Sequence, residues 1–498
     1  MVFSSPIFLL GFLPLFLGLY ALVFAPTRWL SEGPSRRFFF AFSNGFILAA
    51  SLLFYFWGEN WLIVVMLAST TIDYVSGQVI GRSGRPRLRK GFLVVSIVAN
   101  LSLLVFFKYA NFGIEAFTGL ASALGWGQGP VAEMWNISLP LGISFYTFQS
   151  MSYTIDVYRR KVKPTRSFLD FACYVTMFPQ LVAGPIVRYR EVADELRQRI
   201  VSLNDFSYGC LRFTQGLAKK VLISNAAAVP TDAIFAMGAD ELSTGLAWLG
   251  LLGYSIQIYF DFSGYSDMAI GLGRMLGFHF PENFNYPYIA GSIAEFWRRW
   301  HISLSNWFRD YLYFPLGGDR NGPRRVYFNL VTVFFLVGLW HGAAYGYVIF
   351  GLYHGLFLVL ERRGLGARLK RLPRLVQILY MQLVLNLSWI IFRPTDLGQT
   401  KYYAKSVFGM ADTQNDVLSV AEFLTPESAT ALLLGAVFAC PLLPWLLRVK
   451  DRLLLRWSHP IWKVAYGGTK LGVMFAALVL SVATLASGSY NPFIYFRF

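Results

Sequence analysis

Residues 295–318 read EFWRRWHISLSNWFRDYLYFPLGG and set five charged side chains and one histidine among aromatic and aliphatic residues. On a single helix over 295–312, at about 100° per residue, the tryptophans and His301 share one broad face. Arg298 and Arg309 fall on the opposite side. The wider stretch 263–325 is too polar to span a bilayer and too apolar to lie free in water. The pattern therefore predicts an amphipathic helix at the membrane surface, with His301 directed toward the protein interior.

The rest of the sequence places this segment in a membrane protein. Of the 498 residues, 55% are hydrophobic and only 14% are charged, whereas a soluble domain carries about a quarter charged residues. Long apolar runs recur from end to end, and in lipid a helix satisfies its backbone hydrogen bonds within one such run. The runs are continuous and lack the short alternating strands of a membrane barrel. We therefore expect an all-α polytopic membrane protein.

The net charge of +17 lies mainly in the loops. The segment GRSGRPRLRK at 81–90 carries five cations and no acid, which favours a cytoplasmic loop over a nucleic-acid surface. With cationic loops inside, the alternation predicts 11–13 spans and places both termini outside. Between two of these spans, residues 111–137 are expected to form an outer loop. The expected spans lie near 3–25, 38–57, 60–81, 91–110, 138–158, 217–237, 243–262, 326–342, 345–361, 375–392, 428–447 and 464–488.

Three stretches subdivide a single integral membrane domain that covers all 498 residues. Residues 167–187 are apolar but contain two prolines and a glycine, which predicts a re-entrant segment, because irregular backbone at membrane depth needs cover. Residues 263–325 are expected to form a cytoplasm-facing interfacial segment that contains His301. Residues 326–361 are expected to form a helical hairpin that contains His341.

The five histidines are candidates for different roles. His341 follows the apolar run VTVFFLVGLW, and an ionisable ring inside a membrane segment is by default a functional-site hypothesis. His354, in GLYHGLF, meets the same criterion, and an interhelical hydrogen bond is the alternative for both. His279 precedes a bend rich in proline and asparagine, which favours a structural role. His459 lies in a basic loop and is expected at the solvated surface, while His301 remains a candidate through its buried face.

Other motifs narrow the chemistry. Asp261, Asp267 and Arg274 lie within YFDFSGYSDMAIGLGRMLG, where a polar network that locks helices together is favoured over catalysis. Cys173, Cys210 and Cys440 are scattered and indicate neither a disulfide framework nor a zinc site. The sequence contains no Walker A, HExxH, GxSxG or EF-hand pattern, which disfavours ATP-driven transport, zinc proteolysis and hydrolase chemistry.

Two buried histidines suit acyl transfer. A neutral imidazole can take the proton of a hydroxyl as that hydroxyl attacks an ester or thioester carbonyl, and desolvation keeps the ring neutral. Such a reaction needs no metal, no bound cofactor and no covalent enzyme intermediate. Proton-coupled transport, for example by a flippase of a lipid-linked sugar, uses the same residue types. A structural subunit of a secretion complex is a third possibility that the residues leave open.

The segment 295–318, followed by GLWHGA at 338–343, resembles the membrane-bound O-acyltransferase (MBOAT) family. Within the family it is similar to the branch that contains the alginate O-acetylation membrane subunit. The resemblance covers most of the chain. The other segments that carry it are FKYANFG at 107–113, LPLGISFYTFQSMSYTIDVYR at 139–159, FPQLVAGPIVR at 178–188, QIYFDFSGYSDMAIGLG at 257–273 and SYNPFIYFRF at the end of the sequence.

The resemblance implies an O-acyltransferase in which His341 is the general base and His301 its companion, within an MBOAT-type helical bundle around a central funnel. It further implies relay of an acetyl group from acetyl-CoA or another acyl thioester, across a bacterial inner membrane, for O-acetylation of an exported polysaccharide such as alginate. Expected partners are the lipid bilayer, an exported acetyltransferase similar to SGNH hydrolases, and other secretion proteins. Arg298, Arg299 and Trp300 are candidate contacts for the anionic donor; solvated charge is the alternative for the two arginines.

Overall fold

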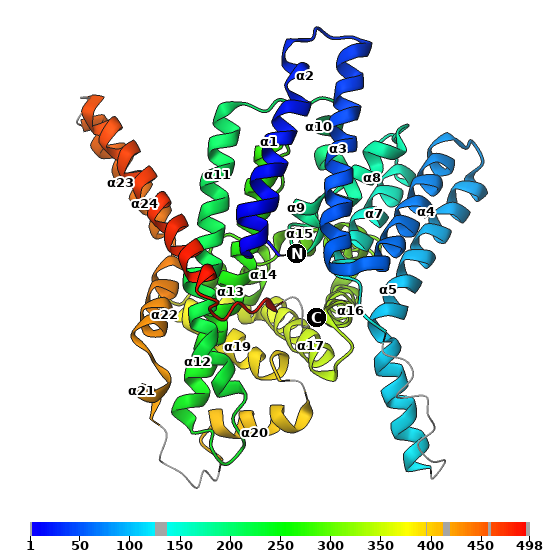
Figure 1. Cartoon of the computed structure of the whole chain (residues 1–498). Helices are drawn as coiled ribbons and strands as arrows, with labels where there is room; N and C mark the ends of the chain where they lie inside the picture. The colour runs from blue at the N-terminus through cyan, green and yellow to red at the C-terminus, as the bar shows by residue number, and fades with distance from the viewer. Residues whose placement is uncertain (1, 125–136, 395, 412–418, 457–459, 495–498) are drawn as a thin grey trace. The chain divides into compact units, whose positions relative to one another are not determined.

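In the part of the chain that a computed structural model describes, helices are the only regular secondary structure, joined by turns and loops (Figure 1). This confirms the expected all-α class. By length and composition, five segments are able to cross a membrane; the expected count of 11–13 spans stays a prediction. These five are Ile7–Trp29, Pro34–Arg82, Pro86–Ala123, Arg374–Phe392 and Val464–Ala486. The described residues are 2–124, 137–394, 396–411, 419–456 and 460–494.

The chain forms two compact units. Unit 1 is assembled from three stretches that are far apart in sequence: Met1–Ser207, Leu272–Pro281 and Trp340–Ala344. Its long helices are apolar over most of their length, and proline stands near the start of several of them, where its missing N–H costs no hydrogen bond. The elements of unit 1 are η1 (Ile7–Phe12), α1 (Leu13–Phe24), α2 (Pro26–Trp29), α3 (Pro34–Glu59), η2 (Asn60–Leu62), α4 (Ile63–Arg82), α5 (Pro86–Ala123), α7 (Ile143–Tyr158), α8 (Phe168–Thr176), α9 (Phe178–Leu181) and α10 (Tyr189–Arg197).

A buried polar cluster sets α5 against α4 and α7 in unit 1. The Asp73 carboxylate on α4 accepts hydrogen bonds from Ser96 Oγ at 2.6 Å and from Asn100 Nδ2 at 2.9 Å, both on α5. Ser96 Oγ also lies 2.8 Å from Thr154 Oγ1 on α7. A buried carboxylate is tolerated when its oxygens are hydrogen-bonded. These contacts therefore fix the position of α5 relative to α4 and α7.

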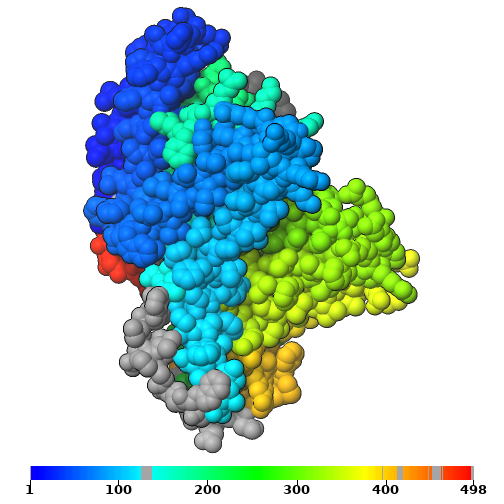
Figure 2. All heavy atoms as spheres, turned by 90° about the vertical axis from the view of Figure 1, so that its right-hand side faces the viewer, coloured from blue at the N-terminus to red at the C-terminus, as the bar shows by residue number. Residues whose placement is uncertain are grey.

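The outward side of α4 and α5 is apolar. Figure 2 shows the surface that these helices form in blue to cyan. Many exposed apolar side chains on one helix are typical of a helix in contact with lipid. The exposed apolar side chains of α5 include Val94, Val95, Val98, Leu101, Val105 and Phe106.

Two expectations for unit 1 can be compared with the structure. The expected outer loop at 111–137 was wrong in its first part, because α5 continues as a helix to Ala123; residues 125–136 lie outside the described part. GIEAFTGLASA contains enough alanine, leucine and glutamate to extend a helix despite its glycines. The stretch 167–187 is broken as expected: α8 ends at Thr176, and α9 is a short helix within a buried segment.

Unit 2 consists of Tyr208–Gly271, Glu282–Leu339 and Tyr345–Phe498. Helix α13 begins at Thr244 and runs on to Met275, so it enters the stretch that was expected to be interfacial. The elements are α11 (Leu203–Ala218), η3 (Lys219–Asn225), α12 (Ala226–Phe235), α13 (Thr244–Met275), η4 (Pro287–Ile289), α14 (Ile293–Arg299), α15 (Ile302–Phe308), η5 (Arg309–Tyr313), α16 (Gly322–His341), α17 (Tyr345–Leu360), η6 (Glu361–Leu365), α18 (Gly366–Leu369), α19 (Arg374–Phe392), α20 (Leu397–Val407), α21 (Val420–Phe423), α22 (Pro426–Phe438), α23 (Leu442–Arg456) and α24 (Pro460–Ala486).

Helices α16 and α17 form the hairpin expected at 326–361. Their backbones approach closely at two glycines: a Cβ added to Gly338 would lie 2.4 Å from the carbonyl oxygen of Tyr347, and one added to Gly351 would lie 2.2 Å from that of Phe334. Small residues allow membrane helices to pack at such short distances. The hairpin therefore depends on glycine at these two positions.

Ion pairs join the helices of unit 2. Asp261 on α13 lies 2.7 Å from Lys220, and both side chains are buried. Asp267, farther along α13, pairs with Arg212 and Lys219 at 2.7 Å each. These pairs match the helix-locking network expected from the sequence. Arg274 belongs to unit 1, where it contacts Asp205 at 3.1 Å.

Candidate functional site

His301 lies at a break between two short helices of unit 2. Helix α14 ends at Arg299 and α15 begins at Ile302, and His301 between them has φ 44° and ψ 54°. The prediction of one continuous helix over 295–312 was therefore wrong. The left-handed conformation is uncommon for a residue other than glycine and persists where the surroundings fix it. Most of the predicted apolar face is nevertheless buried. Its seventh member, Leu312, is half-buried, and the buried members are Trp297, Trp300, His301, Leu304, Trp307 and Phe308.

Asn283 determines which nitrogen of the His301 ring carries a hydrogen. Its Oδ1 atom accepts the main-chain N–H of Ser303 at 3.1 Å and the Ser303 hydroxyl at 2.9 Å. Because a main-chain N–H can only donate, the atom that faces Ser303 is the amide oxygen. The same oxygen lies 3.2 Å from His301 Nδ1, which therefore donates a hydrogen to it. In the neutral ring, Nε2 is then the nitrogen with the lone pair.

The immediate surroundings of His301 are apolar. Its side chain is 1% exposed, and the Phe262 ring lies edge-on at a centroid distance of 4.7 Å. The ring is thus held by the hydrogen bond to Asn283 and by aromatic packing.

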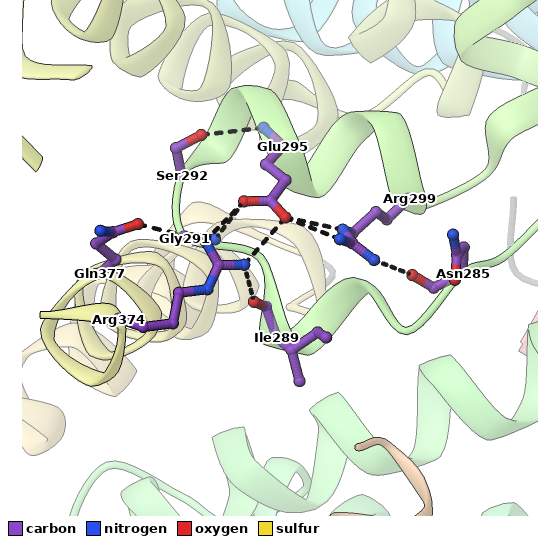
Figure 3. Close-up of polar contacts among 8 residues, drawn as sticks. All are labelled: Asn285, Ile289, Gly291, Ser292, Glu295, Arg299, Arg374 and Gln377. Carbon is purple, nitrogen blue, oxygen red and sulfur yellow. Dashed lines mark hydrogen bonds and ion pairs between the residues drawn. The ribbon is translucent and has the colours of Figure 1, made fainter. Parts of the chain in front are cut away.

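Glu295 joins α14 to the beginning of α19 (Figure 3). Its carboxylate accepts from both terminal nitrogens of Arg374, at 3.0 and 3.1 Å, and from Arg299 at 3.0 Å. The main-chain N–H of Gly291 donates to the same carboxylate at 2.9 Å. Burial alone would raise the pKa of Glu295, but these hydrogen bonds outweigh it and lower the pKa to about 2.

The Glu295 cluster also ties α14 to the loop that carries Asn283. Arg299 Nη1 donates to the Asn285 carbonyl at 3.1 Å, and the Asn285 N–H donates to the Arg299 carbonyl at 2.9 Å. One step farther on, the Ile302 N–H donates to the Asn283 carbonyl at 2.9 Å. The loop therefore runs alongside the helix break, and this pairing holds Asn283 Oδ1 against His301.

The three residues expected on the donor side have different surroundings. Arg299 is engaged by Glu295 and by the Asn285 carbonyl, which gives its charge a structural role. Trp300 is buried and stacks with Phe296 at a centroid distance of 5.5 Å. Arg298 is exposed and forms no ion pair with any residue that the structure describes. Of the three, Arg298 has the side chain best placed to meet an anion from solvent.

His341 is the last residue of α16 and belongs to unit 1. It is partly buried, and its ring lies 5.1 Å from that of Trp340 between centroids. The last carbonyls of a helix lack partners within the helix and carry partial negative charge. His341 therefore stands where main-chain carbonyls need donors from elsewhere in the fold. His301 belongs to unit 2.

The remaining histidines fit structural roles. His354 is fully buried among aromatic rings, and its Nδ1 accepts from Trp297 Nε1 at 3.4 Å, in agreement with the hydrogen-bond alternative. His279 is exposed, and its Nδ1 lies 2.6 Å from the Glu195 carboxylate. His459 lies outside the described residues. Within the described ranges, no group of three or more histidine, cysteine or acidic side chains is arranged to hold a metal ion.

Two residues were not singled out from the sequence: Asn283, which contacts His301, and Lys108, which donates to the carbonyl of Trp340, the residue before His341. Asn283 lies within ENFNYPY, and Lys108 lies within FKYANFG. Asn283 is 18 residues from His301 in the sequence, and Lys108 is 232 residues from Trp340. For Lys108 a signal was present, since a lysine inside an apolar run is costly and indicates a function.

Comparisons with known proteins give a consistent picture. A family model described as "membrane-bound O-acyltransferase family" matches residues 129–386. The chain is 43% identical to a probable alginate O-acetylase AlgI of Azotobacter vinelandii over 443 residues, which are 88% of this chain and 84% of that protein. It is 41% identical to a probable alginate O-acetylase AlgI of Pseudomonas putida over 100% of both chains. A peptidoglycan O-acetyltransferase of Helicobacter pylori is 34% identical over 89% of this chain and 86% of its own length.

Proposed function

Because this chain belongs to the membrane-bound O-acyltransferase family, we propose that it relays an acetyl group across a membrane for O-acetylation of an exported polysaccharide such as alginate. The donor is acetyl-CoA or another cytoplasmic acyl thioester. The names of the relatives, two alginate O-acetylases and a peptidoglycan O-acetyltransferase, support acetyl transfer to a cell-surface polymer. The setting is a bacterial inner membrane with both termini outside, and an exported partner similar to SGNH hydrolases completes the transfer.

In this proposal His341 is the general base. It takes the proton of the acceptor hydroxyl as the hydroxyl oxygen bonds to the acetyl carbonyl carbon. The carbon–sulfur bond then breaks, and the leaving thiolate receives the proton from the imidazolium. One base is sufficient for this reaction, because His341 gains one proton from the hydroxyl and loses it to the thiolate in each turnover. It requires neither a metal nor a covalent enzyme intermediate.

His301 is the companion that holds the donor. The observation that carries this assignment is the hydrogen bond from His301 Nδ1 to Asn283, which leaves the lone pair on Nε2. The pantetheine arm of coenzyme A contains amide N–H groups, and Nε2 is a suitable acceptor for one of them. Exposed Arg298 supplies a cation for the phosphates of the same donor.

Substitution of the histidines tests the proposal. We expect His341→Ala to lower kcat by about 10³-fold, and His301→Ala to raise the KM for acetyl-CoA more than it lowers kcat. The measurement is transfer of radiolabelled acetyl from acetyl-CoA into polymer-bound ester, in membranes open on both sides. His279→Ala is the matched control, because His279 is exposed and its ring contacts the Glu195 carboxylate.

The same variants separate an acyltransferase from a transporter. Loss of acetyl ester with normal polymer export supports the acyltransferase. Loss of export with acetylation of retained polymer supports proton-coupled transport instead. If both histidine variants keep wild-type transfer and export, neither histidine has the assigned role.

Sided labelling tests the relay across the membrane. Cysteine placed at Ala343, two residues after His341, is probed with membrane-impermeant reagents from each side, after Cys173, Cys210 and Cys440 are replaced by serine. Labelling from the outside, in intact spheroplasts, is the expected result. Labelling that occurs only from the cytoplasmic side would contradict a relay through the membrane.

A further inference from the structure

Two consecutive residues of α5 reach the main chain on both sides of His341. Lys108 Nζ donates a hydrogen bond to the carbonyl oxygen of Trp340, the residue before His341. The Tyr109 hydroxyl donates to the carbonyl oxygen of Gly342, the residue after it, at 3.4 Å. All five residues belong to unit 1. The carbonyl groups of the residues before and after the proposed base are thus both contacted from one helix.

Lys108 has further contacts that fix its side chain. Its Nζ lies 3.2 Å from Ser144 Oγ, in the first turn of α7. It also lies 5.6 Å from the centroid of the Trp340 ring, within the range of a cation–π interaction. The Trp340 indole N–H in turn donates to the Ser144 carbonyl at 3.4 Å. Lys108, Ser144 and Trp340 therefore form a closed set of contacts beside His341.

The ring of Trp340 is also packed from α7. Phe145 lies at a centroid distance of 5.7 Å with a steep interplanar angle, and Phe148 stacks at 5.9 Å. Trp340 is buried. Because the Trp340 ring and carbonyl are both held, the backbone that leads into His341 has little freedom to rotate.

A packing role alone does not require a lysine at position 108. Lys108 lies in the apolar helix Pro86–Ala123, where a cationic side chain is costly unless it meets a specific partner. A leucine or methionine would fill the same space without that cost. What lysine adds here is an Nζ donor to the carbonyl end of α16, at the residue that precedes the proposed base.

We propose that Lys108 and Tyr109 are positioning residues that set the main chain of His341 for proton transfer. The proposal rests on the assignment of His341 as general base. Lys108 acts through Trp340 and Tyr109 acts through Gly342, and neither touches the acyl group. A displacement of about 1 Å at a base costs about 100-fold in rate, so the effect belongs to kcat.

The test compares four variants in membranes open on both sides, with radiolabelled acetyl-CoA as donor and polymer-bound ester as readout. Lys108→Met is expected to lower kcat about 100-fold with the KM for acetyl-CoA within twofold of wild type. Lys108→Arg, which keeps a nitrogen donor, is expected to have a kcat at least tenfold higher than that of Lys108→Met. Tyr109→Phe removes one neutral hydrogen bond and is expected to lower kcat about fivefold. Lys90→Met, at an exposed lysine of the same helix, is the matched control and should leave kcat unchanged.

A double variant distinguishes positioning of His341 from a separate role. In a His341→Ala background, Lys108→Met should lower the residual rate less than twofold, because residues that act as one unit are not additive. A further loss of about 100-fold there would overturn the proposal. So would a Lys108→Met variant with wild-type kcat, or one whose loss appears wholly in KM.

The outcomes also separate this inference from the function on which it rests. If His341→Ala is inactive while Lys108→Met keeps its kcat, only the positioning role is wrong. If His341→Ala keeps full activity, both the general base and its positioning residues are wrong. Should Lys108→Met fail to fold, as judged by thermal unfolding in detergent, Tyr109→Phe carries the test, because it removes a single hydroxyl. A Tyr109→Phe variant with unchanged kcat then counts against the proposal.

Discussion

His301 and His341 are held by different means. The ring of His301 is fixed directly, through a hydrogen bond from its Nδ1 to Asn283 and an edge-on contact with Phe262. At His341, the described hydrogen bonds from α5 reach the flanking main chain, at the carbonyls of Trp340 and Gly342. The contact to the ring of His301 determines which ring nitrogen carries the hydrogen. The contacts to the main chain around His341 determine where that residue is placed.

This difference predicts different kinetic consequences. A defect in the support of His301 should change how the donor is held and should appear mainly in KM. A defect in the support of His341 should change the geometry of proton transfer and should appear mainly in kcat. Substitutions on each side test that separation.

Gly142→Ala should have the largest effect on stability, and it affects the contacts that support His341. Gly142 has φ 76°, and an added Cβ would lie 2.3 Å from the carbonyl oxygen of Leu181. Since Gly142 precedes the turn of α7 that carries Ser144, we expect loss of folded protein, measured by gel filtration and thermal unfolding in detergent. Gly322→Ala is the control, because Gly322 has φ 77° but open space around its Cα. If both variants lose stability equally, the clash at Leu181 is not the cause.

Asn283→Leu should have the next largest effect, on the His301 side. It removes the acceptor for His301 Nδ1 and leaves the Ser303 N–H unsatisfied, which costs about 1–3 kcal/mol. The KM for acetyl-CoA should rise about 100-fold, whereas Asn283→Asp, which keeps the acceptor oxygen, should stay within about tenfold of wild type. Asn285→Leu is the matched control, since Asn285 is exposed and bonds to Arg299 through its main chain. A loss confined to kcat would contradict the separation between the two histidines.

Acidification should weaken the His301 side through Glu295. Its pKa falls from the usual 4.5 to about 2 in the folded protein, so the stabilisation is complete above about pH 4.5 and is lost as the pH falls toward 2. Thermal unfolding in detergent between pH 6 and pH 3 should show this decline, and Glu295→Gln should be less stable at pH 6 and less sensitive to acid. An unchanged pH dependence in Glu295→Gln would show that other carboxylates dominate.

Ser303→Ala should have the smallest effect. It removes the hydroxyl that donates to Asn283 Oδ1 at 2.9 Å, but it leaves the main-chain donor and the His301 contact in place. We expect about 1 kcal/mol of lost stability and a KM for acetyl-CoA raised less than fivefold. A rise as large as that of Asn283→Leu would mean that the hydroxyl, rather than the amide, orients the ring.

The sequence predicted the features that depend on local pattern. Apolar runs predicted an all-helical fold, and helical periodicity placed Trp297, His301 and Trp307 correctly on the buried side. The helix break at His301 was not apparent from the sequence. Glycine or proline usually marks such a break, and neither stands at position 300 or 301. The left-handed backbone at His301 is stabilised by Asn283, whose contribution depends on tertiary contact.

The contacts of His341 were beyond the reach of local pattern for a related reason. Lys108 and Trp340 are 232 residues apart, and no spacing rule connects them. Asp73 and Asn100, which fix the register of α5, are also brought together only by packing. A single sequence identifies a lysine in an apolar helix as unusual, but it does not identify the partner.

The three-part make-up of unit 1 has a consequence for synthesis. Its segments Met1–Ser207, Leu272–Pro281 and Trp340–Ala344 leave the ribosome at different times. Until Trp340 has been made, Lys108 lies in an apolar helix without the carbonyl to which it later donates. Contacts of such long sequence separation form slowly. Assembly of unit 1 is therefore expected to be a late step, and unassembled chains would expose a cation within the bilayer that membrane quality control can recognise.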